Sequence, residues 1–425
     1  MILSERSPSE RIRRVATIAY HSSPLVEPGA GDGGGMTVYV RAVAAEHAAR
    51  GIHTDIFTRA NELRPRITRL SPLVRVISID AGPNRPLPKE ALPLHVDDFA
   101  AGVGAFAAAQ RLSYDVVHSH YWQSGLAALP LSERWGAPLI HSQHTLGRVK
   151  NLFLTRDDAP EPATRIAGES SVIGRADVLI PSTDEEWQQL SCLYGASHDR
   201  LRIVYPGVDH AQFKPGDQDR ARTRLGLRPD QAVVLYAGRI QPLKGLDIAL
   251  DAVAHVARSL EREIVFMLVG GPSGPAGERE LARLRGLVSE LALEDRVRFM
   301  GPQPHRTLPG FYHAADALVV CSHSESFGLT ALEAHACGIP IVATPVGGLT
   351  HVVRNGTSGW LVPGANPAMF AAKLETLLTD DALHRSFSNA ALASARRFTW
   401  QRTADELLEL YDCLVAYPTP EACTC

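Results

Sequence analysis

The sequence predicts an α/β protein built from two doubly wound, Rossmann-like domains. Short apolar runs rich in β-branched residues alternate with helical patterns along nearly the whole chain. Such runs are typical of parallel strands, which helices cover on both faces. The alternation of strand and helix patterns is interrupted once near the middle of the chain and then resumes. A chain of 425 residues is long enough for two large domains.

The first half contains seven runs of buried-strand length. They lie at residues 15–20, 53–58, 74–79, 114–120, 138–144, 176–182 and 201–207. Between the first two runs, residues 36–50 place their apolar side chains at helical spacing. We therefore expect a first domain over residues 12–207.

The second half begins after a stretch that contains proline and glycine, Pro206 to Gly216, which is typical of a linker. Six further strand-length runs follow, at residues 232–238, 264–271, 297–301, 315–322, 339–345 and 359–363. Residues 246–260 show helical spacing. We expect a second domain over residues 208–399, followed by a final helix at 400–417.

Composition excludes several classes of protein. Hydrophobic residues make up 45% and charged residues 21% of the chain, as in ordinary globular proteins. The formal net charge of -3 provides no electrostatic basis for binding nucleic acid. The apolar run near the start has only six residues, too few for a signal peptide core or a membrane span. These features predict a cytoplasmic protein without nucleic acid or membrane partners.

Ligands of doubly wound domains bind beyond the carboxyl ends of the strands, so two such domains facing each other would share a central cleft. The first strand leads into a turn with five glycines between Gly29 and Gly35. Glycines let backbone N–H groups approach a phosphate or a sugar closely. The turn lacks the Lys-Ser/Thr ending of a Walker loop. A flexible surface turn is the alternative interpretation.

Two cations follow the first strand of the second domain. Arg239 and Lys244 lie just beyond residues 232–238. A diphosphate leaving group gains negative charge as its bond breaks, and two cations at that point would stabilise it. A solvated basic loop is the alternative.

Two carboxylates lie in the strand, loop and helix that cover residues 315–336. Glu325 is in the loop and Glu333 is eight residues later, inside the expected helix. The pair fits a glycosidase acid and base, hydroxyl binding, or a simple ion pair, and the spacing alone does not choose among them. The helix start, at Ser326 to Leu329, offers backbone N–H groups to a phosphate.

Four histidines end two successive strands of the first domain: His118, His120, His141 and His144. Clustered histidines suggest a metal site. Neither a cysteine nor a carboxylate completes a ligand set nearby in the sequence, and the cysteines lack the paired spacing of a zinc site. We therefore expect no metal site among these side chains.

The motifs together resemble a known family. GRIQPLKG, SESFGLTALEA and GIPIVATPVGG, at these separations, are similar to the retaining glycosyltransferases of family 4, which have the GT-B fold. HSSPLVEPGAGDGGGMTVYV, VVHSHYWQSG and LIHSQHTLGRVKN resemble the branch that acts on D-inositol 3-phosphate in mycothiol biosynthesis. The resemblance covers nearly the whole chain.

The resemblance implies roles for individual residues. Arg239 and Lys244 would hold the diphosphate, Glu325 the sugar hydroxyls and Glu333 the ribose hydroxyls, with His144 against the donor sugar. The implied donor-binding residues are Gly35, Arg239, Lys244, Gln303, Glu325, Phe327, Gly328, Leu329 and Glu333, and the implied catalytic residues are Arg239, Lys244, His144 and Glu325.

The resemblance also implies an acceptor site. The residues lining it would be His21, Asp32, Gly33, Gly34, Gly35, Met36 and Thr37. Lys89, Tyr121, Thr145 and Arg165 would bind the acceptor phosphate, and all four positions hold the family residue. Three departures concern acceptor and base recognition: Thr37 replaces an asparagine, Gln303 replaces an arginine of some members, and HSQHTLGRVK differs from the usual HTAHTLAAVK.

The resemblance therefore predicts transfer of N-acetylglucosamine from UDP-N-acetylglucosamine to 1D-myo-inositol 3-phosphate with retention. A related enzyme acting on an aminocyclitol or on a thiol such as ergothioneine is the nearest alternative, because of Thr37. A non-catalytic nucleotide-sugar sensor is a third. The partners would be two small molecules and no cofactor would be needed for the chemistry. A peripheral Mg²⁺ and a homodimer are compatible with the resemblance.

Overall fold

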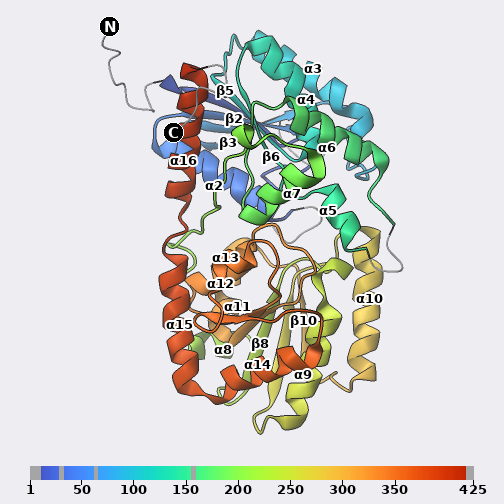
Figure 1. The fold of residues 1–425 in the computed structure, drawn as a ribbon, viewed down its shortest axis with the longest axis vertical. Coiled ribbons are helices and arrows are strands. Elements are labelled where there is room, and N and C mark those ends of the chain that lie inside the picture. The colour runs from blue at the N-terminus through green and yellow to red at the C-terminus, as the bar shows by residue number, and fades with distance from the viewer. Residues whose placement is uncertain (1–10, 28–32, 62–65, 155–158, 418–425) are drawn as a thin grey trace. The chain divides into compact units, whose positions relative to one another are not determined.

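The computed structural model describes residues 11–27, 33–61, 66–154 and 159–417, and its described part forms two compact units (Figure 1). Of the described residues, those within 11–26, 35–207 and 400–417 belong to the first unit. Glu27, Gly33, Gly34 and Val208–Thr399 belong to the second. Within the described ranges no helix is long and apolar enough to cross a membrane.

The first unit is built on a seven-stranded sheet with the order β3-β4-β2-β1-β5-β6-β7. Its strands are β1 (Arg14–Ile18), β2 (His53–Arg59), β3 (Ile67–Ser71), β4 (Val74–Ile79), β5 (Val116–His120), β6 (Leu139–Ser142) and β7 (Val178–Leu179). All pairs are parallel except β3 with β4. The parallel strands run outward in both directions from β1 and β5, as in a doubly wound domain.

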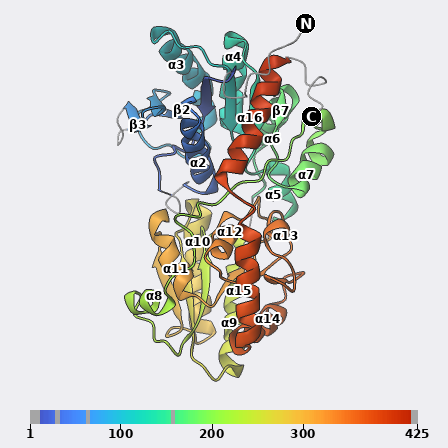
Figure 2. The same cartoon turned by 90° about the vertical axis from the view of Figure 1, so that its left-hand side faces the viewer.

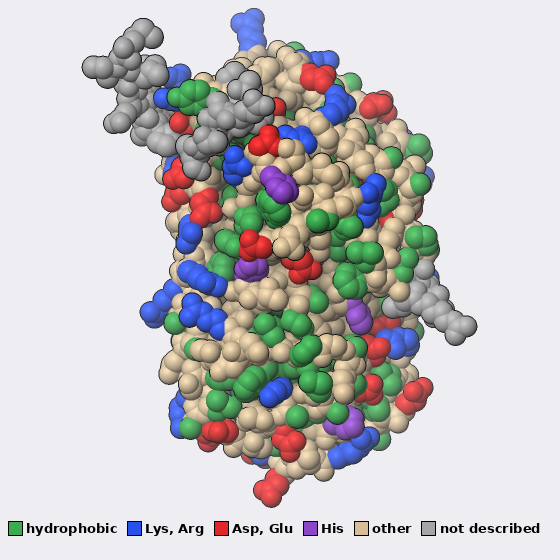
Figure 3. Space-filling model, viewed as in Figure 1, with side chains coloured by type: hydrophobic (Ala, Val, Ile, Leu, Met, Phe, Trp, Pro, Cys, Tyr) green, Lys and Arg blue, Asp and Glu red, His purple; other side chains and the backbone are tan. Residues whose placement is uncertain are grey.

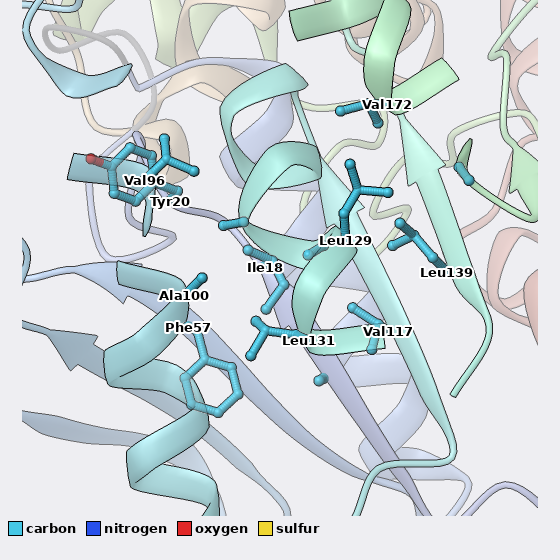
Figure 4. Close-up of a cluster of buried hydrophobic side chains, with 14 of the residues drawn as sticks. Ile18, Tyr20, Phe57, Val96, Ala100, Val117, Leu129, Leu131, Leu139 and Val172 are labelled. Atoms are coloured by element: carbon cyan, nitrogen blue, oxygen red, sulfur yellow. The ribbon is translucent and has the colours of Figure 1, made fainter. Parts of the chain in front are cut away.

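The helices of the first unit are α2 (Gly35–Ala49), α3 (Val96–Ala109), α4 (Trp122–Trp135), α5 (Gly147–Leu152), α6 (Ala163–Arg175), α7 (Asp184–Tyr194) and α16 (Trp400–Ala416), with short 3-10 turns η1 (Leu92–His95) and η2 (His198–Arg200). Figure 4 shows part of the core, where side chains of β1, β5 and β6 meet those of α3, α4 and α6. Ile18, Phe57 and Val117 are fully buried there.

Helix α16 belongs to the first unit although it is the last element of the chain. It packs along α2, and the two helices lie side by side in Figures 1 and 2. The rings of Tyr39 and Trp400 meet edge to face at 5.6 Å, and Arg50 forms an ion pair with Asp405 at 2.6 Å. Tyr411 is fully buried.

The second unit contains a six-stranded, fully parallel sheet with the order β10-β9-β8-β11-β12-β13. Its strands are β8 (Ala232–Ala237), β9 (Ile264–Val269), β10 (Val297–Gly301), β11 (Ala317–Val320), β12 (Ile341–Ala343) and β13 (Gly359–Leu361). Strands β8, β9, β11 and β12 are buried along their whole length, which explains their unbroken apolar sequences.

The helices of the second unit are α8 (Gln218–Arg224), α9 (Leu246–Ser259), α10 (Gly274–Glu290), α11 (Leu308–Ala314), α12 (Leu329–Ala336), α13 (Leu349–Val352), α14 (Pro367–Thr379) and α15 (Asp381–Ala395), with 3-10 turns η3 (Pro242–Lys244) and η4 (His305–Thr307). Helix α9 buries a continuous apolar face, and α14 packs against it. On the surface, basic and acidic side chains are interspersed over the face drawn in Figure 3, in keeping with the small net charge.

The predicted fold class, two doubly wound α/β domains, is confirmed, but one predicted strand is wrong and one strand of the structure was not predicted. Residues 201–207 form no strand: Leu201 makes one isolated bridge to Leu179, because Pro181 has no N–H with which to continue the ladder. Strand β3 was not predicted: it is the edge strand of the sheet, and all of its side chains are exposed or half-buried.

Glu27, Gly33 and Gly34 group with the second unit, although the first domain predicted from the sequence includes them. Two contacts explain this. The Glu27 carboxylate lies 3.8 Å from the Arg306 guanidinium, and a Cβ atom added to Gly34 would lie 3.8 Å from Nε of Arg239.

Candidate active site

Each unit has one place where its strand order reverses, and the predicted site residues follow the strands that meet there. In the first unit β1 lies beside β5, and His21 and Tyr121 follow these strands. In the second unit β8 lies beside β11, and Arg239 and Glu325 follow them. Ligands of doubly wound domains bind at this reversal point.

Lys244 and Glu325 are brought together in the second unit. The Lys244 ammonium lies 2.5 Å from Oε2 of Glu325, and both side chains are about four-fifths buried. The turn η3 holds Lys244 in place, because the backbone N–H of His323 donates to the carbonyl of Leu243 at 2.9 Å. A cation and a carboxylate therefore lie side by side beyond the carboxyl ends of β8 and β11.

Arg239 follows β8 directly. The Tyr236 hydroxyl donates to the Arg239 carbonyl at 2.7 Å, which fixes the backbone of this residue while its side chain stays half-buried. Burial raises the pKa of Tyr236 well above its ordinary value, so the hydroxyl remains a donor. The predicted pair of cations, Arg239 and Lys244, thus comes from one strand end and the turn that follows it.

The loop between β11 and α12 carries Glu325 to Leu329. Gly328 precedes α12, and Leu329 is the first residue of that helix. Phe327 is buried and packs edge to face on Phe398, with ring centroids 5.7 Å apart. The first N–H groups of a helix have no partner within the helix, and they favour anions. The loop therefore presents such groups next to Glu325.

The glycine pair of the motif TPVGG fits tightly against this loop. A Cβ atom on Gly347 would lie 1.6 Å from the carbonyl oxygen of Glu325, and one on Gly348 would lie 2.1 Å from that of Phe327. Gly347 also has φ +51°, which side-chain-bearing residues rarely adopt. The two glycines let residues 347–348 support the loop that holds Glu325.

Glu333 is held on both of its carboxylate oxygens. His305 Nε2 lies 2.6 Å from one oxygen, and the Tyr312 hydroxyl donates to the other at 2.9 Å. Glu333 itself is only 4% exposed. The sequence analysis missed His305 and Tyr312, which lie outside the motif that contains Glu333. Gln303, two residues before His305, is half-buried and donates to the Met300 carbonyl at 2.8 Å.

In the glycine-rich segment, Asp32 lies outside the described residues. Gly33 and Gly34 precede α2, Gly35 is its exposed first residue, and Met36 and Thr37 belong to its first turn. Thr37 is only 1% exposed.

The four predicted phosphate-binding residues come together in the first unit. The Arg165 guanidinium donates to the Thr145 hydroxyl at 3.1 Å. Arg165 lies 5.2 Å and Lys89 6.0 Å from the centre of the Tyr121 ring. The His21 ring packs against the same tyrosine at 4.3 Å. Two cations and two hydroxyls therefore gather beyond β1, β5 and β6.

Tyr121 and His144 both have backbone conformations that non-glycine residues rarely adopt. Tyr121 has φ 75° and ψ 151°, and His144 has φ 61°. Such conformations cost on the order of 1–3 kcal/mol each and occur most often at functional sites. Tyr121 directly follows β5, and His144 lies just after β6. Both were predicted from the sequence to contact a ligand.

Three of the predicted histidines, His118, His120 and His141, are buried, and His144 is half-buried beside His120. His118 lies 2.6 Å from the Tyr411 hydroxyl and 3.0 Å from the Ser142 hydroxyl. His120 Nδ1 lies 3.0 Å from His144 Nε2. Burial lowers the pKa of His144 to about 3, and it lowers the pKa of His118 and His120 well below the ordinary value. These rings are neutral at physiological pH.

In the parts of the chain that the structure describes, no group of three or more His, Cys, Asp or Glu side chains is arranged to hold a metal ion.

The two units each match a known protein family. Residues 34–207 match the family described as glycosyl transferase 4-like domain, and residues 217–393 match glycosyl transferases group 1. A D-inositol 3-phosphate glycosyltransferase of Acidothermus cellulolyticus is 49% identical over 405 residues, which cover 94% of this chain and 90% of that protein. The chain belongs to the glycosyltransferase family.

Other similarities of this glycosyltransferase agree with the assignment. A D-inositol 3-phosphate glycosyltransferase of Mycobacterium marinum is 46% identical, over 94% of this chain and 85% of that protein. Among solved structures, sucrose-phosphate synthase from Thermosynechococcus elongatus superposes with a TM-score of 0.87 and 31% identity, covering 95% of this glycosyltransferase and 99% of that chain.

Anabaena HepE, solved in complex with UDP and glucose, superposes with a TM-score of 0.74 and 20% identity, covering 94% and 99% of the two chains. These likenesses identify the fold as GT-B, with two Rossmann-like units in one chain.

Proposed function

We propose that this glycosyltransferase transfers N-acetylglucosamine from UDP-N-acetylglucosamine to 1D-myo-inositol 3-phosphate with retention of configuration. One observation carries the acceptor assignment: Lys89, Tyr121, Thr145 and Arg165 gather from four separate segments around one position. The names of its relatives, D-inositol 3-phosphate glycosyltransferases at 44–49% identity, support the same acceptor.

The chemistry of this cluster suits a phosphate group. Arg165 has a planar fork of donors, and Lys89 adds a second cation near the same Tyr121 ring. The hydroxyls of Tyr121 and Thr145 can donate to further phosphate oxygens. We therefore assign the phosphate of the acceptor to this cluster.

The donor diphosphate is assigned to Arg239 and Lys244. During transfer, the bond between the anomeric carbon and the diphosphate oxygen breaks, and a bond to the acceptor oxygen forms on the same face of the sugar. The acceptor proton moves to the leaving phosphate oxygen. Because negative charge grows on the diphosphate, the two cations stabilise the transition state more than the ground state.

Glu325 and Glu333 would bind hydroxyls of the donor rather than act as an acid and base pair. Glu333 is fixed by His305 and Tyr312, an arrangement that suits a constant hydrogen-bond acceptor for ribose hydroxyls. Glu325 lies against Lys244 and would orient the sugar beside the diphosphate.

We also propose that the reaction needs no added metal ion, because Arg239 and Lys244 supply the positive charge that the leaving group requires. Turnover in the presence of EDTA should match turnover without it. A loss of activity that Mg²⁺ restores would contradict this part of the proposal.

The alternative acceptor classes are an aminocyclitol and a carboxylate-bearing thiol such as ergothioneine. Thr37, in the first turn of α2, is the observation that favours them, because relatives acting on inositol phosphate are expected to carry asparagine there. A carboxylate could also bind to Lys89 and Arg165.

An acceptor panel tests the assignment. The enzyme is incubated with UDP-N-acetylglucosamine and, in parallel, inositol 3-phosphate, inositol, an aminocyclitol and ergothioneine. Products are identified by mass spectrometry and the anomeric configuration by NMR. We expect an α-linked product from inositol 3-phosphate and little from inositol. Glycosylation of another acceptor, with inositol 3-phosphate neither reacting nor inhibiting, would overturn the proposal.

A further inference from the structure

Arg165, the central cation of the phosphate cluster, already has a partner on each guanidinium nitrogen. Its Nε donates to Glu169 at 2.8 Å and its Nη2 to the Thr145 hydroxyl at 3.1 Å. Its Nη1 lies 2.9 Å from Oε2 of Glu161. An incoming phosphate that uses the Arg165 fork must therefore replace one of these partners.

The two carboxylates on Arg165 differ in how firmly they are held. Glu169 is fully buried, accepts the Gly147 N–H at 3.0 Å on both oxygens and accepts the Tyr194 hydroxyl. Glu161 is 22% exposed and lies in the irregular segment just before α6. Its carboxylate is shared between two cations, Arg165 and Lys150, whose Nζ lies 2.9 Å from Oε1. Glu161 is the partner that can leave.

We propose that Glu161 is a displaceable counter-ion of the acceptor site, and that Lys150 is a further ligand of the acceptor phosphate. The Glu161 carboxylate bridges Arg165 and Lys150 in the way a phosphate oxygen pair would bridge them. Binding of the acceptor exchanges a carboxylate of charge -1 for a phosphate of charge -2 between the same two cations. This inference rests on the proposed function, in which a phosphorylated acceptor occupies this cluster.

Protonation does not release Glu161 near neutral pH. Burial alone would raise the pKa of Glu161, but the charges of Arg165 and Lys150 outweigh it and hold this pKa below its usual range. The charged and titratable groups that face Glu161 or its two partners are Lys89, Tyr121, Lys150, Arg165, Glu169 and Tyr194. The carboxylate therefore leaves in its ionised form, in competition with the phosphate.

The competition gives the site a pH signature. The second pKa of a phosphate monoester is about 6, so the group is a monoanion below this pH and a dianion above it. The monoanion carries the same charge as the carboxylate that it must displace. Acceptor KM should therefore fall as pH rises through about 6, and this dependence should be weaker when residue 161 is neutral.

Steady-state kinetics on Glu161→Gln tests the proposal. We expect acceptor KM to fall about tenfold with unchanged kcat, because one charge-assisted competitor is removed. The pH dependence of KM should flatten in the same variant. Lys150→Met should raise acceptor KM about tenfold. Glu133→Gln is the matched control, because Glu133 forms an exposed ion pair with Arg175 in the same unit; its KM should not change.

Inorganic phosphate separates this inference from the proposed function. Its binding is measured by calorimetry on the full chain, without any acceptor or turnover. We expect Glu161→Gln to bind phosphate about tenfold more tightly than the parent, and Lys150→Met to bind it more weakly. If Glu161→Gln bound phosphate no more tightly than the parent and had an unchanged unfolding temperature, the proposed role of Glu161 as a displaceable counter-ion would be wrong. Failure of inositol 3-phosphate to react would overturn only the acceptor assignment, because phosphate binding would still decide the role of Glu161.

Discussion

At the residue scale, the pairing of Lys244 with Glu325 is central to the proposed chemistry. The 2.5 Å contact means that the Lys244 charge is already oriented before a donor arrives. A preorganised cation costs little reorganisation when charge develops on the leaving group. In the proposed function, removing Lys244 would also leave the Glu325 carboxylate facing the donor diphosphate.

We expect Lys244→Ala to lower kcat far more than it raises the donor KM. Losing one preorganised charge contact costs roughly 3 kcal/mol, or about a hundredfold in kcat. Steady-state kinetics at saturating acceptor measures the two parameters. Lys373→Ala is the control, since Lys373 lies over the Trp360 ring at 4.1 Å and has no assigned role in catalysis. An unchanged kcat with only a raised KM would contradict the role of Lys244.

Glu333→Gln should give the opposite pattern. A ribose contact is alike in the ground and transition states, so its loss weakens nucleotide binding and leaves kcat nearly unchanged. Losing a hydrogen bond to a charged group should weaken UDP binding by about 1.5–3 kcal/mol. Calorimetry with UDP measures this loss. A hundredfold drop in kcat with normal UDP affinity would instead place Glu333 at the reacting centre.

Some of these residues could be predicted from the sequence and others could not. Arg239, Lys244, Glu325 and Glu333 lie in one motif or directly after a strand, so local sequence locates them. His305 and Tyr312 lie outside the motif of Glu333, and folding brings them to its carboxylate. Lys150 lies within a quoted motif, but only folding shows that Glu161 joins it to Arg165. The only sequence feature that could have pointed to His305 is its position as a polar residue shortly after β10.

At the scale of elements, the β11–α12 loop and the turn at 347–348 depend on each other. We expect Gly347→Ala to abolish most activity and to lower the unfolding temperature. Its Cβ would overlap the Glu325 carbonyl at 1.6 Å, and the backbone at φ +51° is strained for alanine. Because the clash moves the loop that carries Glu325, kcat should fall even at temperatures where the variant is still fully folded. Activity assays below the melting temperature test this.

Gly286→Ala is the matched control. Gly286 lies within α10, and an added Cβ would meet nothing within 4 Å. Alanine at a helix interior stabilises by about 0.5–1 kcal/mol relative to glycine. We expect Gly286→Ala to keep full activity and to melt slightly higher. Equal behaviour of the two variants would show that the 347–348 turn does not support the loop.

The buried histidine cluster makes the first unit sensitive to acid. Burial, then the charge of Arg50, lowers the pKa of His47 to about 3, and burial lowers that of His141 to about 4. The pKa of histidine in the unfolded chain is about 6.5, so below this pH the unfolded chain binds more protons than the folded chain does. The stability that neutral histidines contribute is full above about 6.5 and is lost as pH falls toward 4.

Calorimetry between pH 7.5 and about 5 checks this expectation. Each buried histidine with a lowered pKa, His47 and His141 included, should contribute a loss of about 1.4 kcal/mol per pH unit below about 6.5. His47→Gln removes one such group, which hydrogen-bonds Thr54 at 3.1 Å outside the predicted ligand site, and should reduce the slope accordingly. A slope that does not change in the variant would contradict a neutral His47 in the folded state.

Element prediction from the sequence succeeded where burial is complete and failed at the sheet edges. Strands such as β8 and β9 have unbroken apolar sequences because both faces are covered. Strand β3 is an exposed antiparallel edge, so its sequence ITRLS carries too little apolar signal. The run 201–207 is apolar because Leu201 and Val204 are buried, and not because it pairs as a strand.

At the scale of the whole molecule, α16 completes the first unit from the far end of the chain. It buries Trp400, Leu407, Leu408, Tyr411 and Leu414. Burying a large apolar side chain contributes about 1.5–3 kcal/mol, so the sum reaches the net stability of a typical domain, about 5–15 kcal/mol.

We therefore expect a chain that ends at Thr399 to lose the fold of its first unit, while residues 208–399 alone fold and melt cooperatively. Circular dichroism and proteolysis of the two proteins measure this. Co-expression of α16 as a separate peptide should rescue the truncated chain in part. A truncated chain that keeps a cooperative transition for the first unit would contradict the role of α16.

The position of α16 also sets an order of events during synthesis. A ribosome adds about 5–20 residues per second, so about 10 to 40 s pass between Gly207 and Trp400. During that interval the first unit has all its strands but lacks the helix that covers His118 and packs along α2. The second unit, whose sheet is made in one continuous stretch between Gly207 and Trp400, can close first. The part of the chain that is translated first is therefore completed last, and the face of α2 that α16 covers stays exposed while translation continues.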